Sequence, residues 1–126
     1  MAAKRRILLA EDNADLQKAV ARVAMKHDCE IIPTTSGAAV HGLAVEKQPD
    51  VIILDVAFAD ADGRDVLAAL KADPRTTHIP VVVWSGRAEG ESDRRIALEL
   101  GAEDYVEKID AESLLRKVER ILLRFE

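Results

Sequence analysis

Five polar residues of this chain lie at or just beyond the ends of short apolar runs. They are Glu11, Asp12, Asp55, Ser85 and Lys108. If the runs are neighbouring parallel strands, their carboxyl ends meet at one edge of a sheet, and these side chains converge there. Three carboxylates in one place repel one another unless a cation neutralises them. The pattern therefore predicts a metal site at this edge of a sheet.

The mixture of carboxylate, hydroxyl and ammonium groups also indicates which metal and which reaction to expect. Mg²⁺ takes few protein carboxylates and completes its shell with water and phosphate oxygens, whereas cysteine and histidine ligands for zinc are absent from these positions. A carboxylate nucleophile can attack phosphorus to form an aspartyl phosphate, and we expect Asp55 to be that nucleophile. The expected metal ligands are Glu11, Asp12, Asp55 and the backbone carbonyl of Ala57, and the expected phosphoryl-binding groups are Ser85, Lys108 and the backbone of Ala57 and Gly86.

The elements that must position these residues alternate short β-branched runs with longer stretches at helical spacing. The expected strands are residues 6–10, 30–33, 51–54, 81–84 and 105–106. The expected helices follow Asn13, Ser36 and Asp110, span residues 64–72, and end before Gly101. Because parallel crossovers are right-handed, five βα units of this length predict an α/β fold with a doubly wound, five-stranded parallel sheet of the flavodoxin type.

Composition limits the classes of protein to consider. The chain has 126 residues, 48% of them hydrophobic and 33% charged, with a net charge of -5. This balance suits one globular core and argues against direct binding of nucleic acid or of an anionic membrane. No stretch approaches the roughly 20 apolar residues that span a bilayer, and the single Cys29 cannot form an internal disulfide. We therefore expect one cytoplasmic domain over residues 1–126.

Five motifs, in order and at the expected spacing, make this chain resemble the receiver domains of bacterial two-component response regulators over essentially its whole length. The motifs are Glu11-Asp12, Leu54-Asp55, Asp62-Gly63, Val83-Trp84-Ser85-Gly86 and Gly101-Ala102-Glu103-Asp104-Tyr105-Val106-Glu107-Lys108. The chain looks like a single-domain receiver of the chemotaxis-regulator kind, and the strand order 2-1-3-4-5 is adopted from the chemotaxis receiver.

The resemblance implies a role for the site residues in a phosphorelay. Asp55 takes a phosphoryl group from a phosphohistidine on a sensor histidine kinase or a phosphotransfer protein. Ser85 then moves toward the phosphoryl group while Tyr105 changes rotamer, although a half-buried tyrosine suits core packing equally well. The switch is read by a downstream protein whose identity the sequence does not give, and pairing into homodimers is frequent in the family. Beyond self-catalysed phosphotransfer and autodephosphorylation, no enzymatic activity is implied.

Several residues depart from the usual pattern of receivers. Phe58 and Ala59 stand where methionine and proline are common, and Ile109 replaces the proline that usually follows the lysine. Loss of the proline at the position of Ala59 predicts a looser loop. Ile109 in place of proline argues against the cis peptide that usually follows the lysine. Ala57 and Arg87 occupy positions that tune the lifetime of the phosphate. We therefore expect an altered lifetime, in a direction that the sequence does not give.

Three other functions fit part of this pattern. A pseudo-receiver would keep the fold without turning over phosphate, and Phe58-Ala59 is the best support for it. The chain would also suit the receiver part of a longer regulator or hybrid kinase. A metal-dependent phosphohydrolase should have a second acid two residues after the nucleophile, where Ala57 stands. His27, His41 and His78 are expected to be structural or solvated.

Overall fold

A parallel sheet forms the centre of the computed structural model, which describes residues 4–56, 58–86, 91–108 and 110–125. Within these residues the strands are β1 (Arg5–Ala10), β2 (Cys29–Thr34), β3 (Val51–Leu54), β4 (Val81–Ser85) and β5 (Asp104–Glu107). Their order is β2-β1-β3-β4-β5, and every neighbouring pair is parallel. The expected strand order is confirmed, and each expected strand lies within one residue of its observed bounds.

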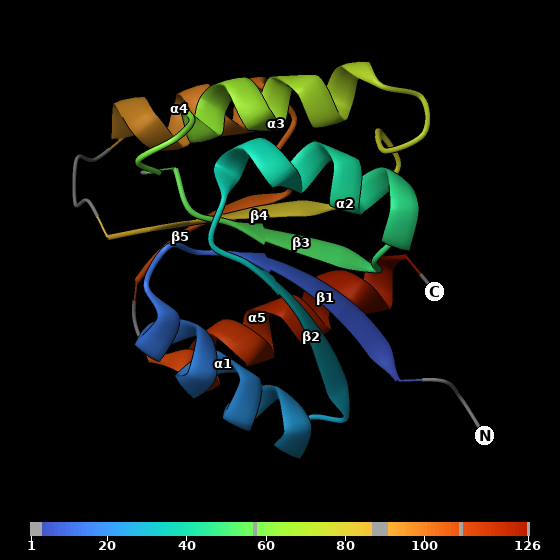
Figure 1. The fold of residues 1–126 in the computed structure, drawn as a ribbon, viewed down its shortest axis with the longest axis vertical. Helices are drawn as coiled ribbons and strands as arrows, with labels where there is room; N and C mark the ends of the chain where they lie inside the picture. Colours follow the sequence, from blue (N-terminus) through green and yellow to red (C-terminus); the bar gives the residue numbers. More distant parts are fainter. Residues whose placement is uncertain (1–3, 57, 87–90, 109, 126) are drawn as a thin grey trace.

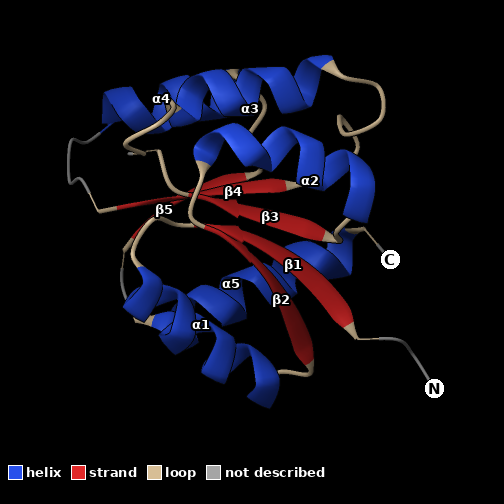
Figure 2. Ribbon diagram, in the orientation of Figure 1, coloured by secondary structure: helices blue, strands red, loops and turns tan. Residues whose placement is uncertain are grey.

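Helices cover both faces of the sheet (Figures 1 and 2). On one face lie α1 (Ala14–Lys26) and α5 (Ala111–Arg124), and on the other lie α2 (Val40–Lys47), α3 (Gly63–Ala72) and α4 (Glu91–Glu99). Two apolar clusters fill the spaces between sheet and helices, one on each face. All four residues of β3 are buried, as expected for a central strand that is covered on both faces. Among the described residues, none of the helices has the length and apolar character needed to cross a bilayer.

The ends of the helices follow from local capping chemistry. The carboxamide of Asn13 accepts from the Leu16 N–H at 3.0 Å, and the carboxylate of Asp110 accepts from the Ser113 N–H at 2.9 Å. Gly101 adopts a φ of +107°, which suits the turn after α4. Ser36 caps the 3₁₀ helix η1 (Gly37–Ala39), which leads into α2, so the expected cap precedes the α-helix by one short turn.

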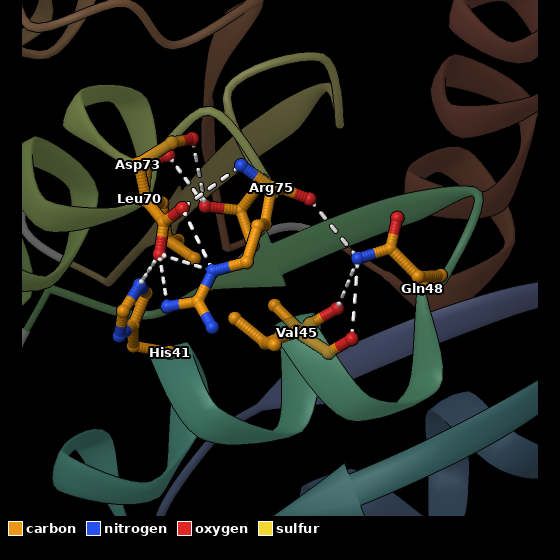
Figure 3. Close-up of polar contacts among 8 residues, drawn as sticks. His41, Val45, Gln48, Leu70, Asp73 and Arg75 are labelled. Atoms are coloured by element: carbon orange, nitrogen blue, oxygen red, sulfur yellow. Dashed lines mark hydrogen bonds and ion pairs between the residues drawn. The ribbon is translucent and has the colours of Figure 1, made fainter.

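A polar network ties α2 to the connection between α3 and β4 (Figure 3). The carboxylate of Asp73 contacts Nε2 of His41 and Nη2 of Arg75, both at 2.8 Å. Nε2 of Gln48 donates to the carbonyl of Arg75 at 3.0 Å and to two carbonyls of its own helix. Since Asp73 precedes a proline and is extended, α3 ends where the sequence predicted.

A second polar bridge joins the two helices on the opposite face. His27 ends α1, and its Nε2 lies 2.6 Å from Oε1 of Glu112, while its Nδ1 contacts Oε1 of Glu119, both on α5. Ionised carboxylates only accept hydrogen bonds, so the protonated imidazole, which donates through both ring nitrogens, fits this arrangement best. The pKa of His27 is raised by the hydrogen bond to Glu112, and the contact with Glu119 adds to that effect against the opposing effect of burial.

Candidate functional site

The ends of the central strands bring the predicted carboxylates together. The N–H of Glu11 donates to the Thr34 carbonyl at 3.1 Å, and the N–H of Asp55 donates to the Ala10 carbonyl at 3.0 Å, which continues the sheet pairing just beyond the strands. Carboxylate oxygens of Glu11, Asp12 and Asp55 all lie within 4.8 Å of one another. Glu11 and Asp55 are 1% and 4% exposed, whereas Asp12 is exposed. Two carboxylates of the acidic cluster are thus buried, and the third faces solvent.

Lys108 supplies the positive charge of the site. Its Nζ donates to Oδ2 of Asp55 at 2.9 Å and contacts Oε1 of Glu11, although Lys108 follows the outermost strand, β5. Its backbone N–H donates to the Ser85 carbonyl at 2.7 Å, which fixes the start of the β5–α5 loop beside β4. Nζ also lies 5.3 Å from the centroid of the Trp84 ring. Burial lowers the pKa of Lys108, but the hydrogen bonds to Glu11 and Asp55 outweigh it, and the pKa is raised.

Glu11 is held more firmly than an exposed acid would be. Its Oε2 accepts from the N–H of Asn13 at 3.1 Å, and its carbonyl accepts from Nε2 of Gln17 at 2.7 Å. Burial raises the pKa of Glu11, while the hydrogen bond from Lys108 opposes this rise. A second cation at the site would favour the charged form further.

Two further predicted residues lie beside this cluster. Ser85 is the last residue of β4 and is 1% exposed, and it pairs in register with Glu107 of β5. Gly86 follows it in the exposed loop, where a Cβ atom would lie 3.5 Å from Cδ of Lys108.

Tyr105 lies on β5 and is 9% exposed, and its hydroxyl has no hydrogen-bond partner among the described residues. Ala57, Arg87 and Ile109 lie outside the described residues. The roles expected for Ala57 in holding metal and phosphate therefore stay predictions, as does the effect of Ala57 and Arg87 on phosphate lifetime.

The loop after Asp55 is anchored to the neighbouring β2–η1 loop, which the sequence did not indicate. The carboxylate of Asp60 accepts from Oγ of Ser36 at 2.6 Å and from the N–H of Gly37 at 3.0 Å. The ring of Phe58 lies so close to Gly37 that a Cβ atom there would stand 2.9 Å from it. These contacts tie the loop after Asp55 to the segment that follows β2.

The start of α3 lies directly against the backbone of the same loop. A Cβ atom on Gly63 would lie 2.4 Å from Cα of Val56 and 2.8 Å from the carbonyl oxygen of Asp55. The N–H of Gly63 donates to the Val56 carbonyl at 3.1 Å. Only glycine allows the helix to approach the acceptor residue so closely.

Residues 7–119 match the response regulator receiver domain. The chain belongs to this family. The receiver is 37% identical to the response regulator PleD of Caulobacter vibrioides over 96% of its own length and 26% of PleD. It is 27% identical to the protein PilH of Pseudomonas aeruginosa, over 93% of its own length and 97% of PilH. The receiver thus spans about half or less of several curated relatives but nearly all of PilH.

Solved structures agree with the family assignment. The crystal structure of the Mn²⁺-bound form of the response regulator Rcp1 is 32% identical, with a TM-score of 0.74, and the match covers 93% of this receiver and 91% of that chain. The chain is therefore a response regulator receiver domain, homologous to two-component regulators, and a phosphoacceptor role fits its family. Receiver domains are signalling domains that interact with histidine kinases or phosphotransfer proteins.

The residues present suit the divalent metal that this family binds at an acidic pocket. The donors are carboxylate oxygens alone, which hard cations prefer. Lys108 contacts two of the three carboxylates, so the fully ionised cluster keeps a formal charge of -2 that a divalent cation would cancel. The exposure of Asp12 leaves a side of the cluster open for an ion and its waters to enter.

Proposed function

We propose that Asp55 is the phosphoacceptor and that a sensor histidine kinase or a phosphotransfer protein is the donor. The observation that carries this proposal is the contact of Lys108 Nζ with Asp55 Oδ2 at 2.9 Å, inside the cluster of three carboxylates. An ammonium group in this place can bind a phosphoryl oxygen as soon as Asp55 carries one. The geometry of the acid, the lysine and the open side of the cluster supports phosphoryl transfer better than a purely structural ion pair.

In the proposed transfer, an oxygen of Asp55 forms a bond to phosphorus as the bond from phosphorus to the donor's imidazole nitrogen breaks. The electron pair of that bond stays with the imidazole. Lys108 then exchanges part of its contact with Asp55 for a phosphoryl oxygen, while the Ser85 hydroxyl and the backbone of Ala57 and Gly86 bind the others. A bound divalent cation supplies neutralisation of the charge shared by the carboxylates and the phosphoryl group.

We propose Mg²⁺ as the ion, held by Glu11, Asp12, Asp55 and the carbonyl of Ala57. Oxygen-only donors and the open side of the cluster support this choice, because Mg²⁺ keeps several waters and accepts phosphate oxygens. The Mn²⁺-bound form of Rcp1 shows a divalent ion in a related receiver. We further propose that this receiver acts in the cytoplasm as one domain over residues 1–126. Its phosphorylated form is read by a downstream protein through Ser85 and Tyr105, and homodimerisation is one route to that output.

Intact mass measurement after treatment with acetyl phosphate tests the assignment. The protein should gain one phosphoryl group with Mg²⁺ and none with a chelator, and Asp55→Asn should gain none. Asp65→Asn is the matched control, because Asp65 is an exposed aspartate on α3, and it should behave as the unmodified protein does. A gain that persists in Asp55→Asn would overturn the choice of acceptor. No gain with Mg²⁺ would indicate a pseudo-receiver, and catalytic consumption of the donor without a phosphorylated protein would indicate a phosphohydrolase.

A further inference from the structure

The side chain of Lys108 has to cross a whole strand to reach Asp55. Lys108 follows β5 and Asp55 follows β3, and β4 lies between these two strands. Neighbouring strands are about 4.8 Å apart, so two spacings separate the backbones of the two residues by roughly 10 Å. The side chain that β4 places under this crossing therefore helps to decide where the ammonium group rests.

The register of the sheet places Trp84 under that crossing. The β3–β4 pairing makes Asp55, the residue after β3, level with Trp84 on β4. Trp84 pairs with Val106 of β5, and both belong to the same apolar cluster. Lys108 comes two residues after Val106 and so starts from the same face of the sheet. Its Nζ lies 5.3 Å from the centroid of the Trp84 ring, within the limit of about 6 Å for a cation–π contact.

The indole N–H of Trp84 indicates that this side chain does more than fill the core. Trp84 is 0% exposed and is the largest fully buried side chain of the described residues, and its Nε1 has no hydrogen-bond partner among them. A buried donor without a partner has lost its water without a replacement, a penalty that an apolar side chain would avoid. No ligand can supply the partner, because the ring is sealed from solvent. What leucine or methionine would lack here is an aromatic face, and that face lies beside the ammonium of Lys108.

The ring offers the ammonium an attraction that the carboxylates cannot keep up during the reaction. Lys108 contacts Glu11 and Asp55, but a divalent cation and a phosphoryl group would compete for both acids. The Trp84 ring takes part in neither of those contacts, and the apolar cluster between the sheet, α1 and α5 holds it in place. Its attraction for a cation therefore persists when the carboxylates are engaged elsewhere.

We propose that Trp84 is a positioning residue whose buried ring keeps the ammonium of Lys108 above β4, within reach of Asp55, before and after a phosphoryl group arrives. The contact itself follows from the geometry, and only its effect on phosphorylation rests on the proposed function. The side chain of Lys108 is 22% exposed, so without the ring the ammonium would be freer to turn toward solvent. Phosphoryl transfer to Asp55 should then slow.

Ring-current shifts in NMR spectra test the contact directly. In a chain labelled with ¹³C-lysine, the Cε protons of Lys108 are assigned as the signal that Lys108→Met removes. They should resonate upfield of the other lysine signals, because protons over an aromatic face are shielded. Trp84→Leu should abolish this upfield shift, and Trp84→Phe should keep part of it. Mg²⁺ should change the size of the shift, since the ammonium gives up a carboxylate, but should not abolish it.

Lys18→Met is the matched control for the assignment. Lys18 is an exposed residue on α1, so its replacement removes the same charge and should leave the upfield signal in place.

A fluorine series tests the effect of the ring face on the reaction. Trp84 is the only tryptophan in the chain, so a fluorinated tryptophan replaces this ring alone. Fluorine withdraws electrons from the aromatic face with little change of shape. Phosphorylation by acetyl phosphate with Mg²⁺, followed by intact mass, should slow about threefold from tryptophan to 5,6,7-trifluorotryptophan, with 5-fluorotryptophan between them. Trp84→Phe should react faster than Trp84→Leu, and urea unfolding should show that the fluorinated chains are as stable as the parent.

Three results would overturn the proposal. One is the absence of an upfield signal from Lys108, and another is its disappearance when Mg²⁺ is added. The third is an equal rate across the fluorine series together with equal rates for Trp84→Phe and Trp84→Leu, which would leave Trp84 a packing role alone. If the unmodified chain gains no phosphoryl group, the proposed function fails, and the upfield signal still decides whether the ring holds Lys108.

Discussion

Replacement of His27 by glutamine should destabilise the receiver in a pH-dependent way. The substitution removes a ring that contacts Glu112 and Glu119 and so joins α1 to α5. The side chain of His27 is 17% exposed, whereas those of Glu112 and Glu119 are 39% and 45% exposed, so solvent screens both pairs in part. At about 0.5–1 kcal/mol for each pair, the loss comes to about 1–2 kcal/mol where the ring is charged. For a domain of this size that lowers the Tm by about 3–8 °C.

The sign of the pH dependence follows from the direction of the pKa shift. The pKa of His27 is raised in the folded state, so the folded state binds the proton more tightly than the unfolded state does. Its contribution is complete below the unfolded pKa of about 6.5 and disappears as the pH rises through the folded pKa. The free-energy difference between the parent and His27→Gln should therefore be largest near pH 6 and smaller near pH 9.

Urea unfolding at both pH values measures this difference. His78→Gln serves as the control, because His78 is exposed, and it should leave the pH dependence of stability unchanged. Equal destabilisation by His27→Gln at low and high pH would refute the protonated bridge and leave only a packing role for the ring.

Three further predictions concern the site and its support. Gly63→Ala should destabilise the fold by about 2–3 kcal/mol through overpacking against Val56, and it should slow phosphorylation. Gly42→Ala is the control, because a Cβ has open space there inside α2, and it should stabilise the fold by about 0.5–1 kcal/mol. Equal unfolding free energies for the two variants would contradict this prediction. Lys108→Met should bind Mg²⁺ about fivefold more tightly, because an ammonium group no longer competes for the carboxylates. The repulsion between two cations this close is worth about 1 kcal/mol in water. Weaker binding by the variant in a titration calorimeter would contradict a site shared by lysine and metal. Trp84 should report that binding by a change of fluorescence, since Lys108 Nζ lies 5.3 Å from its ring, and an unchanged signal at saturating Mg²⁺ would show that the lysine does not move.

The sequence predicted the parts of this structure that depend on local pattern. The uniformly apolar β3 is typical of a central strand, and Asn13 and Asp110 cap their helices as the spacing indicated. Convergence of Glu11 with Asp55 followed once their strands were taken as neighbours. The strand order itself came from resemblance, because alternation of strands and helices does not determine which strands pair.

The sequence did not reveal the contacts that depend on side chains from distant segments. Nothing in the sequence singles out Asp60, whose carboxylate accepts hydrogen bonds from Ser36 and Gly37. Phe58 is notable in the sequence only as a departure from the usual pattern of receivers, and its ring packs against Gly37. His27 and His41 were expected to be structural or solvated, and both turn out to join helices to other elements. None of these pairs has a sequence spacing that would mark it, because each depends on tertiary placement.

The hydrogen bonds of Lys108 also bear on biosynthesis. The lysine contacts an acid 97 positions earlier, across two intervening strands. A nascent chain on the ribosome, or one clipped before its final strand, would therefore hold its acids without their ammonium partner. The charge balance of the acidic cluster thus depends on a sheet that is complete through β5.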